Sequence, residues 1–384
     1  MSEAPVAPLG ADELTAWLHL LHSEGVGRDT ARRLLAHFGG PQAAVAATPA
    51  DLAGMVNPKI AETLARAPAG HALRLAKTLA WRNAGPTRRV MVLGDADYPP
   101  LLLHSADPPL LLYLQGRAEL LNARSVAIVG SRQASAQGLD NARAFARSLA
   151  QNGWAIVSGL AAGIDAAAHQ GALEADAEGG AGTVAVVGTG LDRIYPRSHQ
   201  ALTERIAEQG LLVSELALGT PPLAPNFPQR NRLIAGLSRG TLVVEAALRS
   251  GSLITARLAA EAGREVMALP GSLLAPQSHG CHALIRQGAA LVTSPQQVLD
   301  ELNGLPALSL LDALAEPAAA PVTAEAAAED AVLRALGHDP LSLDALINRC
   351  GWQAPALSAH LLTLELDGLV ARLPGGLYQR RQSS

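Results

Sequence analysis

Between residues 120 and 302, short runs of β-branched and apolar residues alternate with longer helical patterns. The runs are SVAIVG, WAIVSG, TVAVVG, LLVSEL, TLVVEA and EVMALPG, at 125–130, 154–159, 183–188, 211–216, 241–246 and 265–271. Continuous apolar strands separated by helices are typical of a parallel sheet whose two faces are both covered. This rhythm predicts a doubly wound α/β domain over residues 86–302, with ligands expected beyond the carboxyl ends of the strands.

The chain on either side follows other patterns. Residues 1–85 predict short helices, two of which flank Gly25-Val26-Gly27 as in a helix-hairpin-helix, although a single copy is weak evidence and a small helical domain with a tight turn explains them better. Residues 303–330 are rich in Ala, Pro and Glu, as in a linker. Residues 331–384 predict three helices and two strands around a Pro-Gly-Gly turn, the layout of a winged helix.

The expected recognition helix of this last domain, residues 354–368, carries Glu365 and Asp367 but neither Lys nor Arg. Because a duplex would repel such a helix, we expect it to pack or to contact protein.

Composition limits the possible partners. The formal net charge is −4, so a nucleic-acid site requires a local focus of positive charge. No apolar run approaches the ~20 residues of a membrane span, and the N-terminus lacks the pattern of a secretory signal. The two cysteines, Cys281 and Cys350, have no metal-ligand spacing. We expect a cytoplasmic protein with no membrane contact, metal or cofactor.

Small and polar residues stand where four of the predicted strands end. In chain order they are Gly130, Ser131 and Arg132; Ser158, Gly159 and Gly163; Gly188, Gly190 and Arg197; and Phe227, Arg230, Asn231 and Arg232. The carboxyl ends of parallel strands meet at one edge, so these groups should converge. Glycines admit a close backbone, helix N-termini donate N–H groups, and arginine offers a fork for phosphate. Several such pockets beside a phenylalanine fit single-stranded nucleic acid better than a duplex.

Two other kinds of site are weaker. A dinucleotide site needs GxGxxG after a strand, whereas residues 188–193 read GTGLDR. For catalysis, Asp165 is expected to stabilise a helix start and Glu245 to pair with an arginine. The SHGCH stretch at 278–282 is expected to be a structural loop, and residues 249–255 to cap a helix.

Together these stretches resemble one known family. The segments D-A-D-Y-P-P-L-L-L-H-S-A-D-P-P-L-L-L-Y-L-Q-G (95–116), A-I-V-G-S-R, S-G-L-A-A-G-I-D-A-A-A-H, G-T-G-L-D-R-I-Y-P, N-F-P-Q-R-N-R-L-I-A-G-L-S and R-S-G-S-L-I-T-A-R are similar, in order and spacing, to the DNA-processing protein DprA (Smf) family. The resemblance implies an extended Rossmann-like sheet with a helical domain before it and a winged helix after it.

The resemblance also implies a function in natural transformation without catalysis. Such a protein binds and protects incoming single-stranded DNA, loads the recombinase RecA and forms a homodimer, and no small-molecule substrate is expected. By position, Ser131 and Arg132 fall in the first phosphate loop and Ser158, Gly159 and Gly163 in the second. Phe227, Arg230, Asn231 and Arg232 fall in the segment that stacks a base and grips the backbone.

Two details of the resemblance concern single residues. Many family members have a lysine three residues before the phenylalanine, where this chain has Ala224. The segment 279–293 resembles the dimer-forming region, which points to His282, Ile285 and Leu291, although core packing explains the apolar pair equally well.

Two alternatives stay open. One is a nucleotide-processing enzyme of the phosphoribohydrolase kind, whose PGGxGTxxE motif is matched only in part by RSGSLITAR at 249–257. The other is an interaction scaffold that works through its winged helix and dimer surface.

Overall fold

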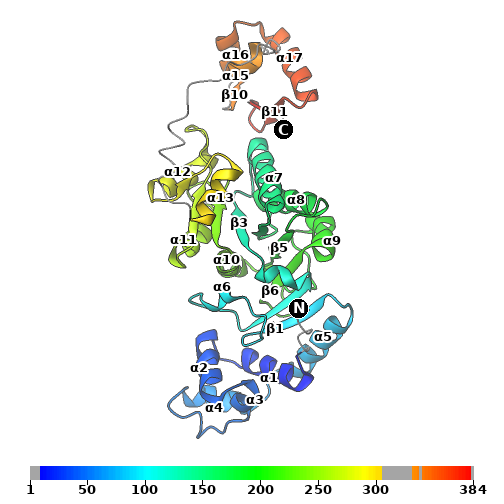
Figure 1. Ribbon diagram of the computed structural model, residues 1–384, viewed down its shortest axis with the longest axis vertical. Coiled ribbons are helices and arrows are strands. Elements are labelled where there is room, and N and C mark those ends of the chain that lie inside the picture. The colour runs from blue at the N-terminus through cyan, green and yellow to red at the C-terminus, as the bar shows by residue number, and fades with distance from the viewer. Residues whose placement is uncertain (1–8, 305–330, 337–339, 382–384) are drawn as a thin grey trace.

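The computed structural model describes residues 9–304, 331–336 and 340–381. The predicted linker lies outside these residues, apart from its first two positions. Figure 1 shows a helical domain at one end of the long axis, an α/β domain in the middle and a small winged-helix domain at the other end.

The first domain is a bundle of short helices. Its elements are α1 (Ala11–His22), α2 (Arg28–Phe38), α3 (Pro41–Ala46), α4 (Pro58–Leu64) and α5 (His71–Asn83). The turn between α1 and α2 is possible because Gly25 takes a φ of +83°. Leu14, Trp17 and Leu34 form a core that continues onto the first two strands of the next domain. The helical domain is therefore packed against the sheet.

The α/β domain is built on one nine-stranded sheet. Its spatial order is β1-β2-β6-β5-β4-β3-β7-β8-β9. In chain order the strands are β1 (Arg88–Val92), β2 (Leu111–Gly116), β3 (Ser125–Val129), β4 (Ala155–Ser158), β5 (Thr183–Val186), β6 (Leu211–Ser214), β7 (Gly240–Val243), β8 (Glu265–Ala268) and β9 (Ala290–Leu291). Strands β3 to β9 run parallel, whereas β2 pairs antiparallel with both β6 and β1.

Helices cover both faces of this sheet. They are α6 (Pro100–Leu103), α7 (Ala136–Gln151), α8 (Ile164–Asp176), α9 (Gln200–Gln209), α10 (Asn226–Leu237), α11 (Ser252–Glu261), α12 (His279–Arg286) and α13 (Pro295–Asn303), with 3-10 turns η1 (Ala118–Asn122), η2 (Arg197–His199) and η3 (Pro276–Ser278). Along β3, Val126 and Ile128 pack with α7 and α8, whereas Ala127 and Val129 pack with α10 and α11. The predicted doubly wound α/β fold is confirmed.

The last described part is a winged helix. It contains α15 (Ala331–Leu336), β10 (Leu341–Ser342), α16 (Leu343–Cys350), α17 (Ala354–Leu366), β11 (Val370–Leu373) and β12 (Leu377–Arg380). The wing turns at Gly375 and Gly376, whose φ values are +87° and +73°. Arg381 makes a two-bond contact of 3.0 and 3.1 Å with Asp140 on α7. No helix among the described residues combines the length and apolar character that a membrane span requires.

Candidate nucleic-acid interface

The loops at the carboxyl ends of β3, β4 and β5 meet the first turns of α10 around one pocket. Its volume is about 80 Å³, more than the ~10–15 Å³ that a single water needs. The lining residues are Arg132, Gly159, Leu160, Ala161, Ala162, Gly188, Thr189, Tyr195, Pro196, Phe227 and Arg230. The predicted convergence of the first three strand ends with the phenylalanine segment therefore occurs at this pocket.

Arg230 forms the buried, charged part of the pocket. Only 7% of its surface is exposed, and its Nη1 donates to the carbonyl oxygen of Val186 at 2.6 Å. Its Nη2 lies 4.0 Å from Oδ2 of Asp165, and its Nε has no hydrogen-bond partner among the described residues. Burial lowers the pKa of Arg230 to about 10, so the guanidinium stays charged at neutral pH. The pocket thus offers a desolvated cation to an anion or a carbonyl oxygen.

Asp165 supports this cation from the first turn of α8. Its Oδ2 accepts the backbone N–H groups of Gly159 at 3.2 Å and Ala161 at 3.3 Å. Burial raises the pKa of this carboxyl, although the charge of Arg230 and the two N–H bonds act in the opposite direction. Asp165 therefore holds the β4–α8 loop and balances Arg230, beyond the helix-start role expected from the sequence.

Glycines are required where the walls of the pocket are closest. A Cβ added to Gly159 would lie 1.6 Å from Nη1 of Arg230, and one added to Gly188 would lie 3.0 Å from the ring of Phe227. Gly163 has a φ of +81°, and a Cβ there would lie 2.2 Å from the carbonyl oxygen of Ser131. The predicted glycines thus admit an arginine, an aromatic ring and a neighbouring loop.

Backbone strain marks the same place. Leu160 has a φ of +58°, and it is the one non-glycine residue with a positive φ in the part of the chain that the structure describes. Its carbonyl oxygen lies 3.1 Å from Nδ1 of His199. Non-glycine residues held in this conformation gather at functional sites, where the surroundings enforce it.

The mouth of the pocket is aromatic and basic. The guanidinium carbon of Arg132 lies 5.5 Å from the centroid of the Phe227 ring. The centroids of the Tyr195 and Phe227 rings are 5.4 Å apart. Arg132 is exposed and makes no ion pair with any described residue, while 43% of Tyr195 is exposed. Tyr195 was not predicted as a site residue, although it stands in the IYP segment, and aromatics make up only 3% of the chain.

Other predicted residues lie beside the pocket. Gly130 and Ser131 are half-buried, and the N–H of Ser131 donates to the carbonyl oxygen of Glu245 at 2.7 Å. Arg197 is exposed in η2, two residues beyond Tyr195. Asn231 is half-buried, with Nδ2 3.3 Å from the carbonyl oxygen of Gly251. These residues border the site without lining it.

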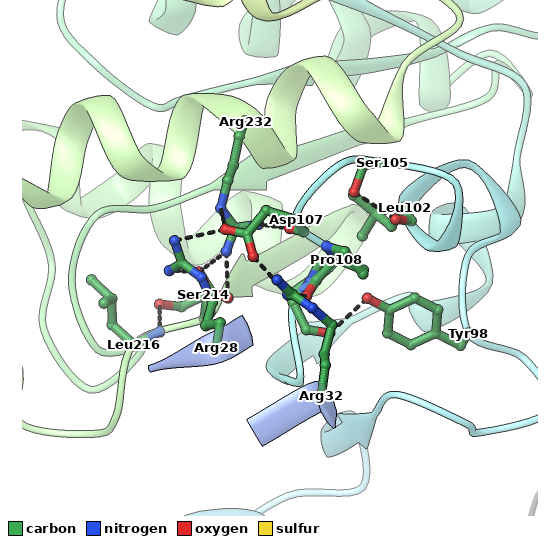
Figure 2. Close-up of polar contacts among 12 residues, drawn as sticks. Arg28, Arg32, Tyr98, Leu102, Ser105, Asp107, Pro108, Ser214, Leu216 and Arg232 are labelled. Atoms are coloured by element: carbon green, nitrogen blue, oxygen red, sulfur yellow. Dashed lines mark hydrogen bonds and ion pairs between the residues drawn. The ribbon is translucent and has the colours of Figure 1, made fainter. Parts of the chain in front are cut away.

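Two predicted contacts need correction. The hydroxyl of Ser158 is fully buried and donates to the carbonyl oxygen of Ile128 at 2.6 Å, so it cannot reach a ligand. Arg232 points away from the pocket and binds Glu215 and Asp107, as Figure 2 shows for Asp107. Residues two apart on a helix differ by about 200°, so Arg230 and Arg232 cannot face one ligand.

Glu245 also binds a different partner from the one predicted. It accepts the backbone N–H of Ser135 at 2.9 Å and the hydroxyl of Ser135 at 2.5 Å, in place of an arginine. Because Ser135 caps α7 and a Cβ on Gly138 would lie 2.4 Å from this carboxylate, Glu245 fixes the start of α7 just beyond Arg132.

The predicted dimer residues lie toward the β9 edge of the sheet, whereas the pocket lies at the central strands β3–β5. Nε2 of His282 on α12 is 3.0 Å from the carbonyl oxygen of Gly271, and Ile285 packs partly into the core. Leu291 is 52% exposed on the edge strand β9. Cys281 is buried, and the SHGCH stretch, expected to be a loop, instead ends η3 and forms the first turn of α12. The described residues hold no cluster of three or more potential metal ligands.

Comparison with known proteins agrees with this architecture in all three domains. Residues 89–303 match the family described as DNA recombination-mediator protein A. Residues 11–65 match a DprA-like N-terminal HHH domain, and residues 316–376 match a DprA winged helix domain.

Individual relatives are similar over most of their length. Protein Smf of Escherichia coli is 44% identical over 80% of this chain and 81% of its own. DNA processing protein DprA of Streptococcus pneumoniae is 49% identical over 54% of this chain and 72% of its own.

Two solved structures are also similar. The X-ray structure of DprA from Streptococcus pneumoniae aligns with a TM-score of 0.65 and 37% identity, covering 77% of this chain and 99% of that one. A Helicobacter pylori DprA structure, whose title describes a single-stranded-DNA binding mode, aligns with a TM-score of 0.50 and 33% identity over 56% and 96%. The chain therefore belongs to the DNA-processing protein DprA (Smf) family.

Proposed function

We propose that this chain binds single-stranded DNA at the pocket and along its rim, and acts by binding rather than by catalysis. One observation carries the proposal: Arg132, from the loop after β3, and Phe227 and Arg230, both from α10, line one pocket. An exposed cation, an aromatic ring and a buried cation are the groups that bind a strand through phosphates and stacked bases. The Helicobacter pylori relative, whose title names single-stranded DNA, supports the assignment.

Each residue has a distinct part in this proposal. Arg132 grips a phosphate beside the Gly130-Ser131 turn, and Phe227 stacks a base with Tyr195 next to it. Arg230 lines the pocket wall and contributes its positive charge toward an oxygen atom of the strand. Gly159 and Gly163 keep the backbone close, and Arg197 and Asn231 contact the strand further along the rim. Ala224 supplies no charge at the position of the frequent lysine, and Arg197, exposed in η2, is one arginine that can contribute a phosphate contact instead.

The enzyme alternative has less support. Among the residues that the structure describes around the pocket, no lining side chain is a carboxylate, and Asp165 is paired with Arg230. Hydrolysis of a nucleoside monophosphate requires a general acid or base next to the substrate. Release of free base from AMP by the purified protein would restore this alternative.

Arg132 tests the phosphate contact directly. We expect Arg132→Ala to weaken oligo-dT binding and to lower the slope of log K against log salt by about 0.7, because one fewer phosphate is neutralised on a single strand. Fluorescence anisotropy over a salt series, with duplex DNA in parallel, measures both. Arg147→Ala is the matched control, since Arg147 is a half-exposed arginine near the far end of α7. Equal slopes for Arg132→Ala and wild type would remove Arg132 from the site.

We also propose a cytoplasmic homodimer that delivers its bound strand to RecA in natural transformation. The exposed Leu291 on the two-residue edge strand β9, next to α12, supports a surface that a second copy can cover. We expect Leu291→Asp to yield monomers in sedimentation and to reduce RecA filament formation on protein-coated single strands. Monomeric wild type would contradict the dimer, and filament formation unaffected by wild type would contradict loading.

A further inference from the structure

Five charged side chains join the helical domain to the α/β domain. We call them the interdomain cluster: Arg28 and Arg32 of α2, Asp107 before β2, Glu215 after β6, and Arg232 of α10. Figure 2 shows Arg28 and Arg32 of α2 and Arg232 of α10 reaching Asp107. The sequence pattern predicts Arg232 as a DNA contact and assigns the other four residues no role in a site.

The distances define a shared network. Arg28 and Arg32 each lie 2.7 Å from a different oxygen of Asp107, and Nε of Arg232 lies 3.3 Å from that carboxylate. Nη1 of Arg232 also donates to the carbonyl oxygen of Asp107 at 2.9 Å. Glu215 accepts both hydrogen bonds from Nη2 of Arg232 and lies 3.5 Å from Arg28.

Burial and charge make the network more than a surface contact. The side chains of Arg232 and Glu215 are only 15% and 16% exposed. Burial opposes ionisation of Asp107, but the bonds from Arg32 and the charges of Arg232 and Arg28 hold its pKa below its usual value. Three guanidinium groups and two carboxylates leave an excess of one positive charge. Because every carboxylate is shared, loss of one loosens several elements together.

Helix α10 connects this network to the pocket. Arg232 is two residues after Arg230 and five after Phe227, so the cluster holds one face of the helix whose other face lines the pocket. The same helix lies close on α6, where a Cβ on Gly236 would stand 2.9 Å from Leu102. Phe227 packs closely on Gly188, and Arg230 packs closely on Gly159. A small rotation of α10 would therefore disrupt both contacts and change the shape of the pocket.

We propose that the interdomain cluster makes the helical domain a positioning element for single-stranded DNA binding, with Arg232 and Glu215 as positioning residues that touch no DNA. This proposal rests on the proposed function of the pocket. It also explains why Arg28 and Arg32, at the start of α2, form ion pairs with carboxylates of the α/β domain.

Glu215 separates positioning from plain electrostatics. Glu215→Gln removes a negative charge, so long-range attraction alone predicts tighter binding of a polyanion. Positioning predicts the opposite, because Arg232 and Arg28 lose the anion that holds them. We expect the Kd for oligo-dT to rise roughly 3- to 10-fold, as for residues that act on a site through another group. The salt slope should not change, since the same phosphates are contacted.

The experiment uses the full chain, with Glu208→Gln as the matched control for net charge. Glu208 is an exposed carboxylate on α9. Anisotropy over a salt series gives the Kd and the salt slope. Hydrogen exchange of the α10 amides reports the stability of that helix directly, and we expect exchange to become faster in Glu215→Gln but not in Glu208→Gln. Arg28→Ala with Arg32→Ala, which leaves the α/β domain intact, is the second test and should give the same rise in Kd and the same slope.

The outcomes are distinct. Wild-type or tighter binding by Glu215→Gln would overturn the positioning role while leaving the proposed function in place. A lower slope in the double arginine variant would also overturn it, because Arg28 and Arg32 would then contact phosphates themselves. A wild-type chain that binds no single-stranded DNA at low salt would instead remove the proposed function.

Discussion

Arg230→Met should abolish oligo-dT binding and lower the free energy of unfolding by about 3–5 kcal/mol, the usual cost of leaving one partner of a buried ion pair alone. Binding is lost because the pocket loses its only buried cation among the described lining residues. Stability is lost because Asp165, 6% exposed, keeps its desolvation penalty without a counter-charge. Anisotropy at low salt and urea unfolding measure the two effects separately.

A double variant separates these effects. Arg230→Met with Asp165→Asn removes both charges while retaining the approximate volumes, so most of the stability should return. Binding should not return, because the cation is still missing. Oligo-dT binding by the double variant at wild-type affinity would show that Arg230 is structural only.

Phe227→Leu should weaken oligo-dT binding by about 1–3 kcal/mol, the range for loss of one base–aromatic stack. Leucine keeps an apolar contact with Gly188 but offers no ring face to a base or to Arg132. Because no phosphate contact is removed, the affinity should fall equally at all salt concentrations, in contrast to Arg132→Ala. The measurement is the same anisotropy series.

Leu103→Ala provides the control for Phe227. It removes an exposed apolar side chain from α6, outside the pocket lining. A Phe227→Leu variant that binds as tightly as this control would exclude base stacking on Phe227.

The parallel part of the fold could be predicted because each of its longer strands is a continuous run of apolar residues in the sequence. The six continuous apolar runs correspond to β3–β8, of which β3–β7 are buried along their whole length and β8 in its second half. Strands β1 and β2 were missed because they form an antiparallel edge, with arginines at 88 and 89 and prolines in the connection. Strand β9 is only two residues long, too short for any period to appear.

The site was predicted in its residue types more than in its contacts. Glycines after strands and an arginine beside a phenylalanine indicate where groups converge, and Arg132, Phe227 and Arg230 do meet. The two arginines of the NFPQRNR segment look equivalent in a one-dimensional pattern, yet helical rotation sends Arg232 to Asp107 and Glu215. Such partners, more than 100 residues apart for Asp107, leave no local signal.

The glycine walls of the pocket have one more consequence. Where Gly159 and Gly188 form the surface, the protein presents main chain, which offers the same groups to adenine, cytosine, guanine and thymine. The ring of Phe227 does not discriminate between bases either, since every nucleobase has a π-face on which the ring can stack. A pocket of this kind has few groups that distinguish one base from another. We therefore expect homopolymers and mixed-sequence oligonucleotides of equal length to compete for the protein with similar affinity.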